Sequence, residues 1–325
     1  MTIDPHLAPP RLISAEQVRA ALPFATLVPA LRDAFARGAT VPVRHHHALP
    51  QGDGSEATLL LMPAWQDGGY LGIKVATIHP ANGRYGLPGV FATYMLCEAA
   101  TGRPLAILDG SELTARRTAA VSALGADYLA RADARTLLVV GAGRVARLLP
   151  AAFASVRPIE RVLIWNVRAE RAAELAETLR AEGFDARPAP ALADAVAKAD
   201  IVSCATLASE PLLAGRWLRP GTHLDLIGSF TPVMREVDDD AVARARIYVD
   251  TEAALAESGD LVAPLAAGII DTAAIIGTVS DLCAGRGSGR GDAADITLFK
   301  SVGTALADLG AAALVHRTTD ASAGE

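Results

Sequence analysis

The sequence has few cysteines, no surplus of basic residues and no long apolar run, and each shortage argues against a class of protein. The three cysteines, Cys97, Cys204 and Cys283, are scattered without a Cys-x-x-Cys pair, so we expect buried thiols in a reducing cytoplasm. Lys and Arg number 30 against 36 Asp and Glu, and the net charge of −6 argues against a nucleic-acid partner.

The apolar segments are too short to cross a membrane. The longest are residues 58–63, 137–140 and 261–270, whereas a spanning helix needs about 20 residues. Residues 1–17 lack a basic segment followed by an apolar one, so we expect no secretory signal and no membrane partner. The chain of 325 residues is 51% apolar, which is enough for two domains with sizeable cores.

The N-terminal third is predicted to form helices and then a β-meander. Residues 14–38 carry apolar side chains at helical spacing, and Pro23 divides them into two helices. Ser14 and Gln17 form a capping-box pattern at the start of the first helix. Four β segments joined by short turns are expected next, at residues 57–62, 70–78, 90–98 and 104–108. An alanine-rich helix is expected over residues 113–131.

From residue 135 the pattern alternates between strands and helices, which is typical of a parallel, doubly wound α/β sheet. Strands are expected at residues 136–140, 161–165, 185–189, 201–205, 223–227 and 245–249. Helices are expected at residues 169–181 and 191–198, and a last apolar helix at 296–314 that packs on the N-terminal domain. The glycine-rich residues 285–292 are expected to form a flexible polar loop.

A dinucleotide-binding motif follows the strand at 136–140. Its residues are Gly141, Ala142, Gly143, Arg144, Val145 and Ala146, which match G-x-G-x-x-A. Gly141 allows the tight turn, Gly143 lets a pyrophosphate approach the backbone, and Ala146 lets helix and strand pack closely. The N-terminus of the following helix attracts the anion. The competing interpretation is a glycine-rich turn that binds nothing.

The end of the second strand of this domain bears on the choice of cofactor. NAD-binding proteins usually place a carboxylate there for the ribose 2′-hydroxyl. This chain has Asn166 and Arg168 and no carboxylate, and an arginine can pair with a 2′-phosphate. The pattern therefore favours NADPH, and NADH stays possible if Arg168 only faces solvent.

Several motifs occur along the chain in the same order as in a known family. They are VRHHH, GIKVATIHPANGRYGLPG, TGRPLAILDG, LTARRTAAVSALGADYLAR, VVGAGRV, GSFTPVMREVDDD and FKSVGTALADL. From about residue 10 to residue 315 the sequence resembles the ornithine cyclodeaminase/mu-crystallin family. The resemblance implies a Rossmann domain, a β-rich α+β dimerisation domain completed by the C-terminal helix, and NAD(P)-dependent chemistry on amino acids or cyclic imino acids. We therefore expect a substrate-binding and dimerisation domain at residues 1–118 and 300–325, and a dinucleotide-binding domain at 119–299.

The resemblance also implies a group of cations that holds the substrate carboxylate. The matching positions are Arg44, Lys74 and Arg117, and the neighbouring Arg116 is expected to point elsewhere. The three cations occur where otherwise apolar segments are briefly polar, and such positions also suit binding of an anionic substrate. The competing interpretation is two surface arginines and a lysine at a strand edge.

Two further features concern acid–base chemistry and metals. Glu56 matches an acidic residue of the family and is a candidate to orient or protonate the substrate nitrogen, although a solvated loop carboxylate fits the sequence equally well. His45, His46 and His47 are adjacent, so on a strand they point to alternate faces and cannot supply three ligands to one ion. We expect no metal.

Phe230 distinguishes the branches of the family. Ornithine cyclodeaminases carry an aspartate at this position, because closing the ring requires a carboxylate that manages ammonium protons. Phe230 accepts no proton and instead forms an apolar wall, so the sequence resembles the branch that reduces Δ1-pyrroline-2-carboxylate or Δ1-piperideine-2-carboxylate to proline or pipecolate. If Phe230 only packs, Glu56 or Asp225 could supply the missing base. Further cofactor contacts are expected from Thr118, Thr206, Leu207, Gly228 and Ser229.

The sequence therefore predicts a cytoplasmic, dimeric NAD(P)H-dependent oxidoreductase that reduces cyclic imino acids in proline metabolism. One alternative is ornithine cyclodeaminase or an amino-acid dehydrogenase of the same family, and ammonia release from ornithine would identify the former. Another is a non-catalytic NADPH-binding protein like mu-crystallin, against which the three cations argue.

Overall fold

A computed structural model describes residues 9–52 and 56–321 of the chain. The chain divides into two compact units, which we call the first and the second unit. The first unit contains the described residues up to Arg117 and those from Thr304 onward. The second unit runs from Thr118 to Gly303. The first boundary falls inside helix α3 (Gly110–Leu129), and the second lies just before helix α11 (Ala305–Ala321).

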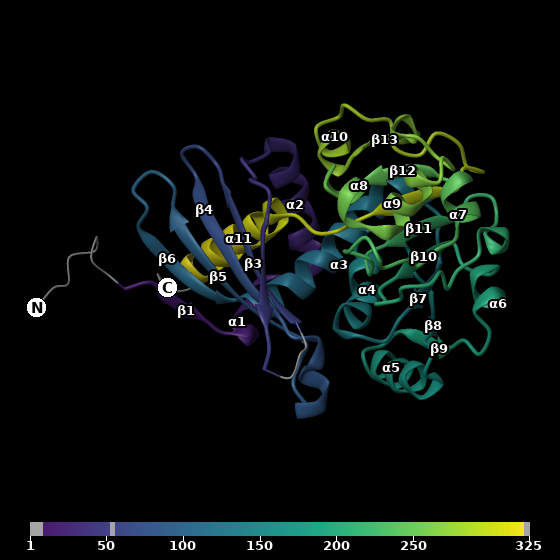
Figure 1. The fold of residues 1–325 in the computed structure, drawn as a ribbon, viewed down its shortest axis with the longest axis horizontal. Coiled ribbons are helices and arrows are strands. Elements are labelled where there is room, and N and C mark those ends of the chain that lie inside the picture. Colours follow the sequence, from purple (N-terminus) through teal and green to yellow (C-terminus); the bar gives the residue numbers. More distant parts are fainter. Residues whose placement is uncertain (1–8, 53–55, 322–325) are drawn as a thin grey trace, which may run out of the picture. The chain divides into compact units, whose positions relative to one another are not determined.

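The first unit is built on a six-stranded sheet with the order β1-β6-β5-β4-β3-β2 (Figure 1). Its strands are β1 (Arg11–Ile13), β2 (His45–Pro50), β3 (Glu56–Trp65), β4 (Tyr70–Ile78), β5 (Val90–Glu98) and β6 (Pro104–Asp109). Strands β3 to β6 pair in antiparallel fashion in chain order, which confirms the predicted meander. Strand β2, which was not predicted, extends it by pairing with β3, and β1 pairs with β6 in parallel. A short 3-10 helix, η2 (Pro80–Tyr85), connects β4 to β5.

The helices of the first unit cover one face of this sheet. Helices α1 (Ala15–Ala21) and α2 (Phe24–Arg37) lie on either side of Pro23, as predicted, and both halves of the Ser14–Gln17 capping box are formed. Helix α11 runs along the sheet and packs against α2, β3 and β4 (Figure 1). The C-terminal segment of the chain therefore completes the core of the N-terminal sheet.

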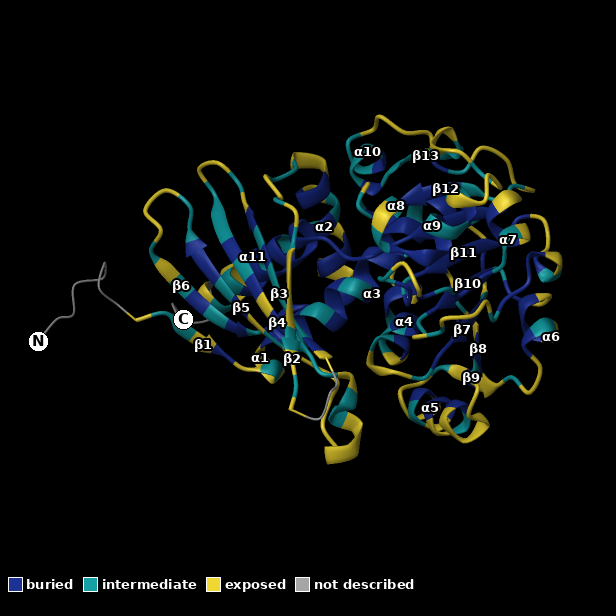
Figure 2. Ribbon diagram, viewed as in Figure 1, coloured by how far each residue is buried: buried dark blue, intermediate teal, exposed yellow. Residues whose placement is uncertain are grey.

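The strands alternate between a buried and an exposed face. Residues on the face under α11, such as Met62, Ala76 and Leu96, are buried, whereas Val75 and Phe91 on the other face are 41% and 46% exposed. Strand β2 is exposed along most of its length (Figure 2). Because side chains alternate along a strand, this sheet has one apolar face without a covering layer in the described chain.

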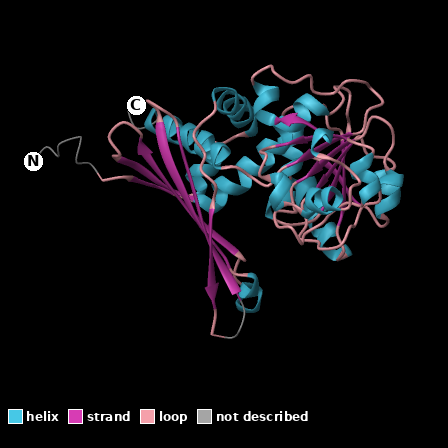
Figure 3. Ribbon diagram, turned by 45° about the horizontal axis from the view of Figure 1, so that its top comes forward, coloured by secondary structure: helices cyan, strands magenta, loops and turns pink. Residues whose placement is uncertain are grey.

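The second unit is a doubly wound parallel sheet, as expected, with eight strands in the order β13-β12-β14-β11-β10-β7-β8-β9. The strands are β7 (Thr136–Val140), β8 (Arg161–Trp165), β9 (Asp185–Pro188), β10 (Ile201–Cys204), β11 (His223–Leu226), β12 (Arg246–Val249), β13 (Ile275–Thr278) and β14 (Thr297–Lys300). Helices lie on both faces of the sheet (Figure 3). They are α4 (Arg144–Ala154), α5 (Ala169–Ala181), α6 (Leu192–Val196), α7 (Asp239–Ala243), α8 (Ala254–Glu257), α9 (Gly259–Ala266) and α10 (Val279–Cys283), with short 3-10 helices η3 (Gly215–Trp217) and η4 (Thr272–Ala274).

The prediction of one helix over residues 296–314 was wrong in its first part. Thr297–Lys300 forms strand β14, which is fully buried between β11 and β12, and the helix begins only at Ala305. A short apolar run fits a buried strand as well as a buried helix, so the sequence pattern did not distinguish them. Gly303, with φ at +81°, lies in the connection to α11.

The glycine-rich residues 285–292 form a loop, as expected, and hydrogen bonds at Gly289 and Arg290 hold it in place. The guanidinium of Arg290 donates hydrogen bonds to the carbonyl oxygens of Leu129, Gly221 and Asp295, and the Tyr248 hydroxyl donates to the carbonyl of Gly289 at 2.6 Å. These bonds hold the loop against the rest of the second unit.

The three cysteines form no disulfide. Cys97 and Cys204 are buried, as expected, while Cys283 is only half-buried. Within the part of the chain that the structure describes, no helix combines the length and the apolar character needed to cross a membrane.

Candidate functional site

A buried cluster of charged side chains lies in the first unit. Lys74 projects from β4 and is 4% exposed, and its Nζ lies 2.8 Å from Oδ2 of Asp308 on α11. Arg117 on α3 is also buried, and its Nε donates to Oδ1 of the same carboxylate at 2.7 Å. The structure thus brings two of the three predicted cations onto one aspartate that the sequence analysis did not single out.

The sheet register explains how the third cation reaches this cluster. His45 of β2 pairs with Leu61, while Met62 of β3 pairs with Lys74 of β4. Arg44 directly precedes His45, so it lies at the same level of the sheet. Its charge is among those that lower the pKa of Lys74, which places Arg44 near the ammonium group.

Burial and neighbouring charges decide the ionisation of the cluster. Burial lowers the pKa of Lys74 most; Asp308 raises it, Arg117 and Arg44 lower it further, and the result is about 8. Burial by itself raises the pKa of Asp308, but the charges of Arg117 and Lys74 outweigh that effect and lower it. Asp308 is therefore a carboxylate at neutral pH, and Lys74 titrates in the physiological range.

Tyr94 of β5 lies opposite Lys74 in the sheet, because the two residues pair across strands β4 and β5. Its hydroxyl lies so close to Gly72 that a Cβ on that glycine would stand 2.0 Å from the oxygen. Burial, and then the charge of Asp308, raise the pKa of Tyr94 well above its usual value, so the phenol is neutral. The hydroxyl has no hydrogen-bond partner among the described residues.

The structure does not bring Glu56 to this cluster. Glu56 begins β3, six residues before Met62, which lies opposite Lys74. At about 3.3 Å per residue the separation along the strand is about 20 Å. Glu56 instead lines a separate pocket of about 240 Å³ together with His79 and Tyr85. The expectation that Glu56 acts on a substrate held by Lys74 and Arg117 therefore has no support in this chain.

Arg116 and the histidine run lie apart from the Lys74–Asp308–Arg117 cluster. The Nε of Arg116 donates to the carbonyl of Leu22 at 2.9 Å, and its guanidinium stacks on Phe24 at 4.7 Å, so it points elsewhere, as predicted. His45, His46 and His47 are all exposed. Among residues 9–52 and 56–321, no group of three or more His, Cys, Asp or Glu side chains could hold a metal.

The glycine motif of the second unit forms the predicted strand–turn–helix. Gly141 follows β7 with φ at +122°, and a Cβ there would stand 2.6 Å from the carbonyl oxygen of Ala205. Gly143 is the N-cap of the eleven-residue helix α4 without a side-chain cap, and a Cβ on it would meet nothing within 4 Å. The free N–H groups and the open space at Gly143 fit the pyrophosphate of a dinucleotide.

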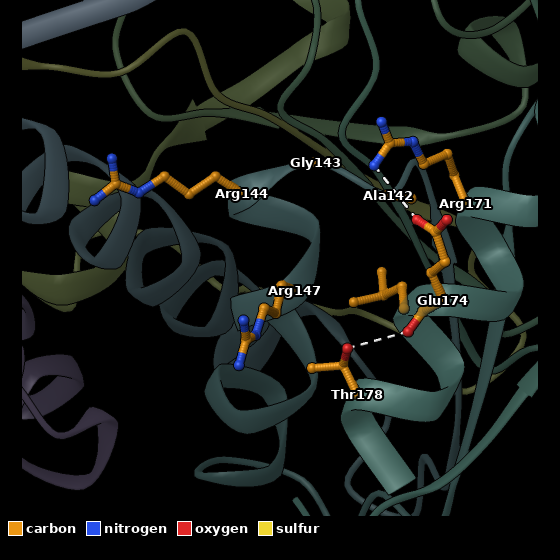
Figure 4. A pocket seen from close by; sticks show the side chains of 8 residues that line it. Ala142, Gly143, Arg144, Arg147, Arg171, Glu174 and Thr178 are labelled. Carbon is orange, nitrogen blue, oxygen red and sulfur yellow. Dashed lines mark hydrogen bonds and ion pairs between the residues drawn. The ribbon is translucent and has the colours of Figure 1, made fainter. Parts of the chain in front are cut away.

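A pocket of about 250 Å³ opens beside this turn (Figure 4). Ala142, Gly143 and Arg144 line it from one side, and Arg171 and Glu174 line it from α5. Arg171 pairs with Glu174 at 3.3 Å, and Figure 4 shows Arg144 pointing away from that pair. Val145 follows within α4 and does not line the pocket.

Asn166 and Arg168 lie at the C-terminal end of β8, as predicted. The Asn166 side chain accepts a hydrogen bond from the backbone N–H of Arg168 at 3.2 Å. Arg168 is the exposed N-cap residue of α5. Its side chain can therefore turn toward a ligand without breaking a hydrogen bond that holds the fold.

Three of the other predicted cofactor residues converge on a buried glutamate. One oxygen of Glu236 accepts from the backbone and side chain of Thr206, at 2.8 and 2.9 Å, and the other accepts from the backbone N–H groups of Gly228 and Ser229, at 2.8 and 3.3 Å. Their amide groups are therefore already used, so any contact with a cofactor involves other atoms. Leu207 is 78% exposed. Thr118 is half-buried on α3.

Glu236 belongs to a buried network that sequence reasoning did not find. Oδ1 of Asp260 accepts from the backbone N–H groups of Glu236 and Val237, while its Oδ2 pairs with Lys300 at 3.0 Å. Lys300 and Asp260 are both fully buried. Glu236 lies in the quoted GSFTPVMREVDDD motif, so its place was visible in the sequence, but its hydrogen bonds were not.

Phe230 and Asp225 differ in their surroundings. Phe230 is partly buried and packs against the hydrophobic core of the second unit. Asp225 is fully buried on β11, where Ser203 donates to it, and burial raises its pKa to about 7. Asp225 is thus enclosed within the sheet of the second unit, and its role as an alternative base stays a prediction.

Comparisons with known proteins agree with this fold and these motifs. The family model of the ornithine cyclodeaminase/mu-crystallin family matches residues 10–323. The chain is 40% identical to a Δ1-pyrroline-2-carboxylate reductase of Paracoccus denitrificans over 290 residues, which cover 86% of this chain and 92% of that protein.

Two solved structures extend the comparison. One is Thermococcus litoralis Δ1-pyrroline-2-carboxylate reductase with NADH and L-proline, at 32% identity and a TM-score of 0.91, covering 96% of this chain and 98% of that one. The other is an archaeal alanine dehydrogenase dimer with bound NAD, at 28% identity and a TM-score of 0.88, covering 96% and 97%. The predicted resemblance is thereby confirmed, and the chain belongs to the ornithine cyclodeaminase/mu-crystallin family.

Proposed function

We propose that this protein is an NAD(P)H-dependent reductase that converts a five- or six-membered cyclic α-imino acid, Δ1-pyrroline-2-carboxylate or Δ1-piperideine-2-carboxylate, into L-proline or L-pipecolate. The observation that carries the proposal is the buried pair of Lys74 and Arg117 on one carboxylate, that of Asp308, with the half-buried Arg44 as a third charge acting on Lys74. Three cations and one anion leave net positive charge for the carboxylate of a substrate. The identity to Δ1-pyrroline-2-carboxylate reductases supports the same reaction.

In this proposal the chain's own residues bind and orient the ring. Arg117 uses Nε for Asp308, so its terminal nitrogens are directed to the substrate carboxylate, and Lys74 and Arg44 hold the other side. Fixing the ring in one orientation lowers the entropic part of the barrier. When bound, a nicotinamide cofactor would supply the hydride that reduces the C=N bond. With Glu56 remote, we assign the proton on the ring nitrogen to Lys74 or to water.

The turn at Gly141, Ala142 and Gly143 and the N-terminus of α4, with Arg144 and Val145 in its first turn, would hold the cofactor. We propose NADPH as the preferred form, with NADH also accepted. After β8 the chain has the exposed Arg168 and no carboxylate, which supports a preference for NADPH. Thr118, Thr206, Leu207, Gly228 and Ser229 remain proposed contacts, of which Gly228 and Ser229 are buried in this structure, and Phe230 remains the proposed apolar wall.

We also propose that the protein is a homodimer joined through the apolar face of the first unit's sheet. Val75, Phe91 and Trp65 are exposed on that face, while its opposite face packs on α11. A large uncovered apolar surface is typical of a protein–protein interface. The lack of any disulfide supports a reducing location such as the cytoplasm.

One assay tests the reaction. NADPH and NADH oxidation is followed with pyrroline-2-carboxylate and with piperideine-2-carboxylate, and ammonia release is measured with ornithine. We expect cofactor oxidation with at least one cyclic imine and no ammonia from ornithine. Turnover of ornithine with no turnover of either imine would contradict the proposal.

A second candidate is an amino-acid dehydrogenase, which the alanine dehydrogenase fold relative favours. A dehydrogenase of this kind would reduce an open-chain oxo acid in the presence of ammonium. Pyruvate with ammonium in the same assay separates the two reactions. The non-catalytic alternative predicts cofactor binding without oxidation for every substrate.

A further inference from the structure

We propose that Asp308 is a positioning residue of the substrate site, whose carboxylate holds Lys74 with one oxygen and Arg117 with the other and so sets the spacing of the cations that receive the substrate carboxylate. This inference rests on the proposed function and adds to it a residue from the far end of the chain. Asp308 follows Arg117 by 191 residues and lies on α11.

The geometry assigns one oxygen to each cation. Arg117 Nε contacts Oδ1 at 2.7 Å and Lys74 Nζ contacts Oδ2 at 2.8 Å, and Asp308 is fully buried. Arginine has five N–H donors and a lysine ammonium has three, so each cation keeps donors that Asp308 does not use. Because a carboxylate is rigid and planar, its two oxygens fix how far apart the cations lie.

The charges around Lys74 show why the carboxylate is needed. Arg44, before β2, and Arg117, on α3, are cations, and Tyr94, on β5, is a neutral phenol. The facing residue of β3 is Met62, which carries no charge. Asp308 on α11 is therefore the anion that favours the protonated form of the buried Lys74 against the charges of two arginines.

If Asp308 only formed a structural ion pair, its removal would affect stability but not substrate binding. Removing one partner of a buried pair costs about 3–5 kcal/mol of stability whether or not the pair touches substrate. A positioning residue also changes the charge of Lys74 and the binding of substrate. The test therefore measures both of these in addition to stability.

The chain contains only three lysines, Lys74, Lys198 and Lys300, which makes the titration of Lys74 directly observable. Protein labelled with ¹³C at the lysine ε-carbon gives three signals by NMR, and a Lys74→Met variant assigns one of them. We expect the Lys74 signal to titrate near pH 8 in the native protein. In Asp308→Asn it should titrate at least about one pH unit lower, because an opposite charge has been removed at close range.

The second measurement is the kinetic effect on the cyclic imino acid. Asp308→Asn should raise KM by about tenfold or more at pH 7.5, with a smaller change in kcat, because it weakens substrate binding rather than hydride delivery. The matched control is Asp320→Asn, an exposed aspartate on the same helix that pairs with Arg11 and His316. It should leave both the Lys74 titration and KM at native values.

Asp308→Glu keeps the proposal testable if the asparagine variant does not fold. It retains the charge, so Lys74 should titrate within about half a unit of native, but the added methylene displaces both cations and should raise KM about fivefold or more. An unchanged Lys74 titration in Asp308→Asn, or a native KM in Asp308→Glu, would overturn the inference. If the native protein reduces no imino acid, the proposed function fails, while the titration still decides whether Asp308 sets the charge of Lys74.

Discussion

Arg116 and Arg117 are adjacent in sequence but bind different parts of the first unit. Arg117 donates to the Asp308 carboxylate, whereas Arg116 donates to the carbonyl of Leu22 and stacks on Phe24. Neighbouring residues on a helix point about 100° apart, so the two identical side chains reach different partners, and only Arg117 joins the proposed substrate site. Arg117 and Arg116 therefore provide a matched pair of variants for testing whether the cations bind the substrate carboxylate.

Arg117→Ala or Lys74→Ala should lower kcat/KM for the imino acid by about 30- to 150-fold, since one charge-assisted contact is worth about 2–3 kcal/mol. Cofactor affinity, measured by fluorescence titration, should stay near native. Arg116→Ala is the control: it should lower the melting temperature but keep the native KM. Full activity of Lys74→Ala would make Lys74 a purely structural residue.

Substrate affinity should fall as the pH rises above about 8. The pKa of Lys74 is lowered from 10.5 to about 8, chiefly by burial, so its positive charge is present below pH 8 and lost above it. KM for the imino acid should therefore rise up to about tenfold for each pH unit above 8. Lys74→Arg stays charged throughout this range and should remove the rise. A KM profile that is flat from pH 7 to 9.5 in the native protein would contradict this role of Lys74.

Arg168→Ala should raise the KM for NADPH more than the KM for NADH, because Arg168 is the exposed cation after β8 that can meet a 2′-phosphate. The ratio of the two KM values is the measurement. Arg171→Ala serves as the comparison, since Arg171 lies on the same helix and pairs with Glu174. A change of the ratio in Arg171→Ala alone would assign the 2′-phosphate to the pocket between α4 and α5 instead.

Phe230→Asp should weaken reduction of the cyclic imine, because it places a charge where an aromatic ring packs against the core. The native protein should release essentially no ammonia from ornithine, and the variant only traces. Phe230→Leu keeps the apolar wall and should retain most of the activity. Robust ammonia release by the native protein would mean that some other group performs the proton transfer.

Val75→Asp should convert the protein to a monomer, because it introduces a charge on the apolar face of the first unit's sheet, where Val75 is 41% exposed. Light scattering after size exclusion gives the mass directly. The control is Val167→Asp, at a valine of the second unit that is 80% exposed. A native monomer, or a Val75→Asp dimer, would show that this face is not the interface.

Much of the fold could be predicted because local patterns were unambiguous. The bounds of β4, β5, β7 and β8 follow from apolar runs bounded by turn residues, and Gly141 and Gly143 sit in the expected strand–turn–helix. The strand at Thr297–Lys300 was mistaken for helix because four buried residues carry no periodicity. The strands β1 and β13 were not found because they are only three and four residues long, and β2 was not found because it is mostly exposed and shows no apolar alternation.

By itself the sequence determined the family, the nucleotide-binding turn and the three cations, since these depend on residue type and spacing along the chain. Only the tertiary structure decided which of them meet. Strand register carries Lys74 to the level of Arg44 and leaves Glu56 about 20 Å away along the strand. The packing of α11 on the sheet brings Asp308 to Lys74 and Arg117, a contact that spans 191 residues and that no local pattern encodes.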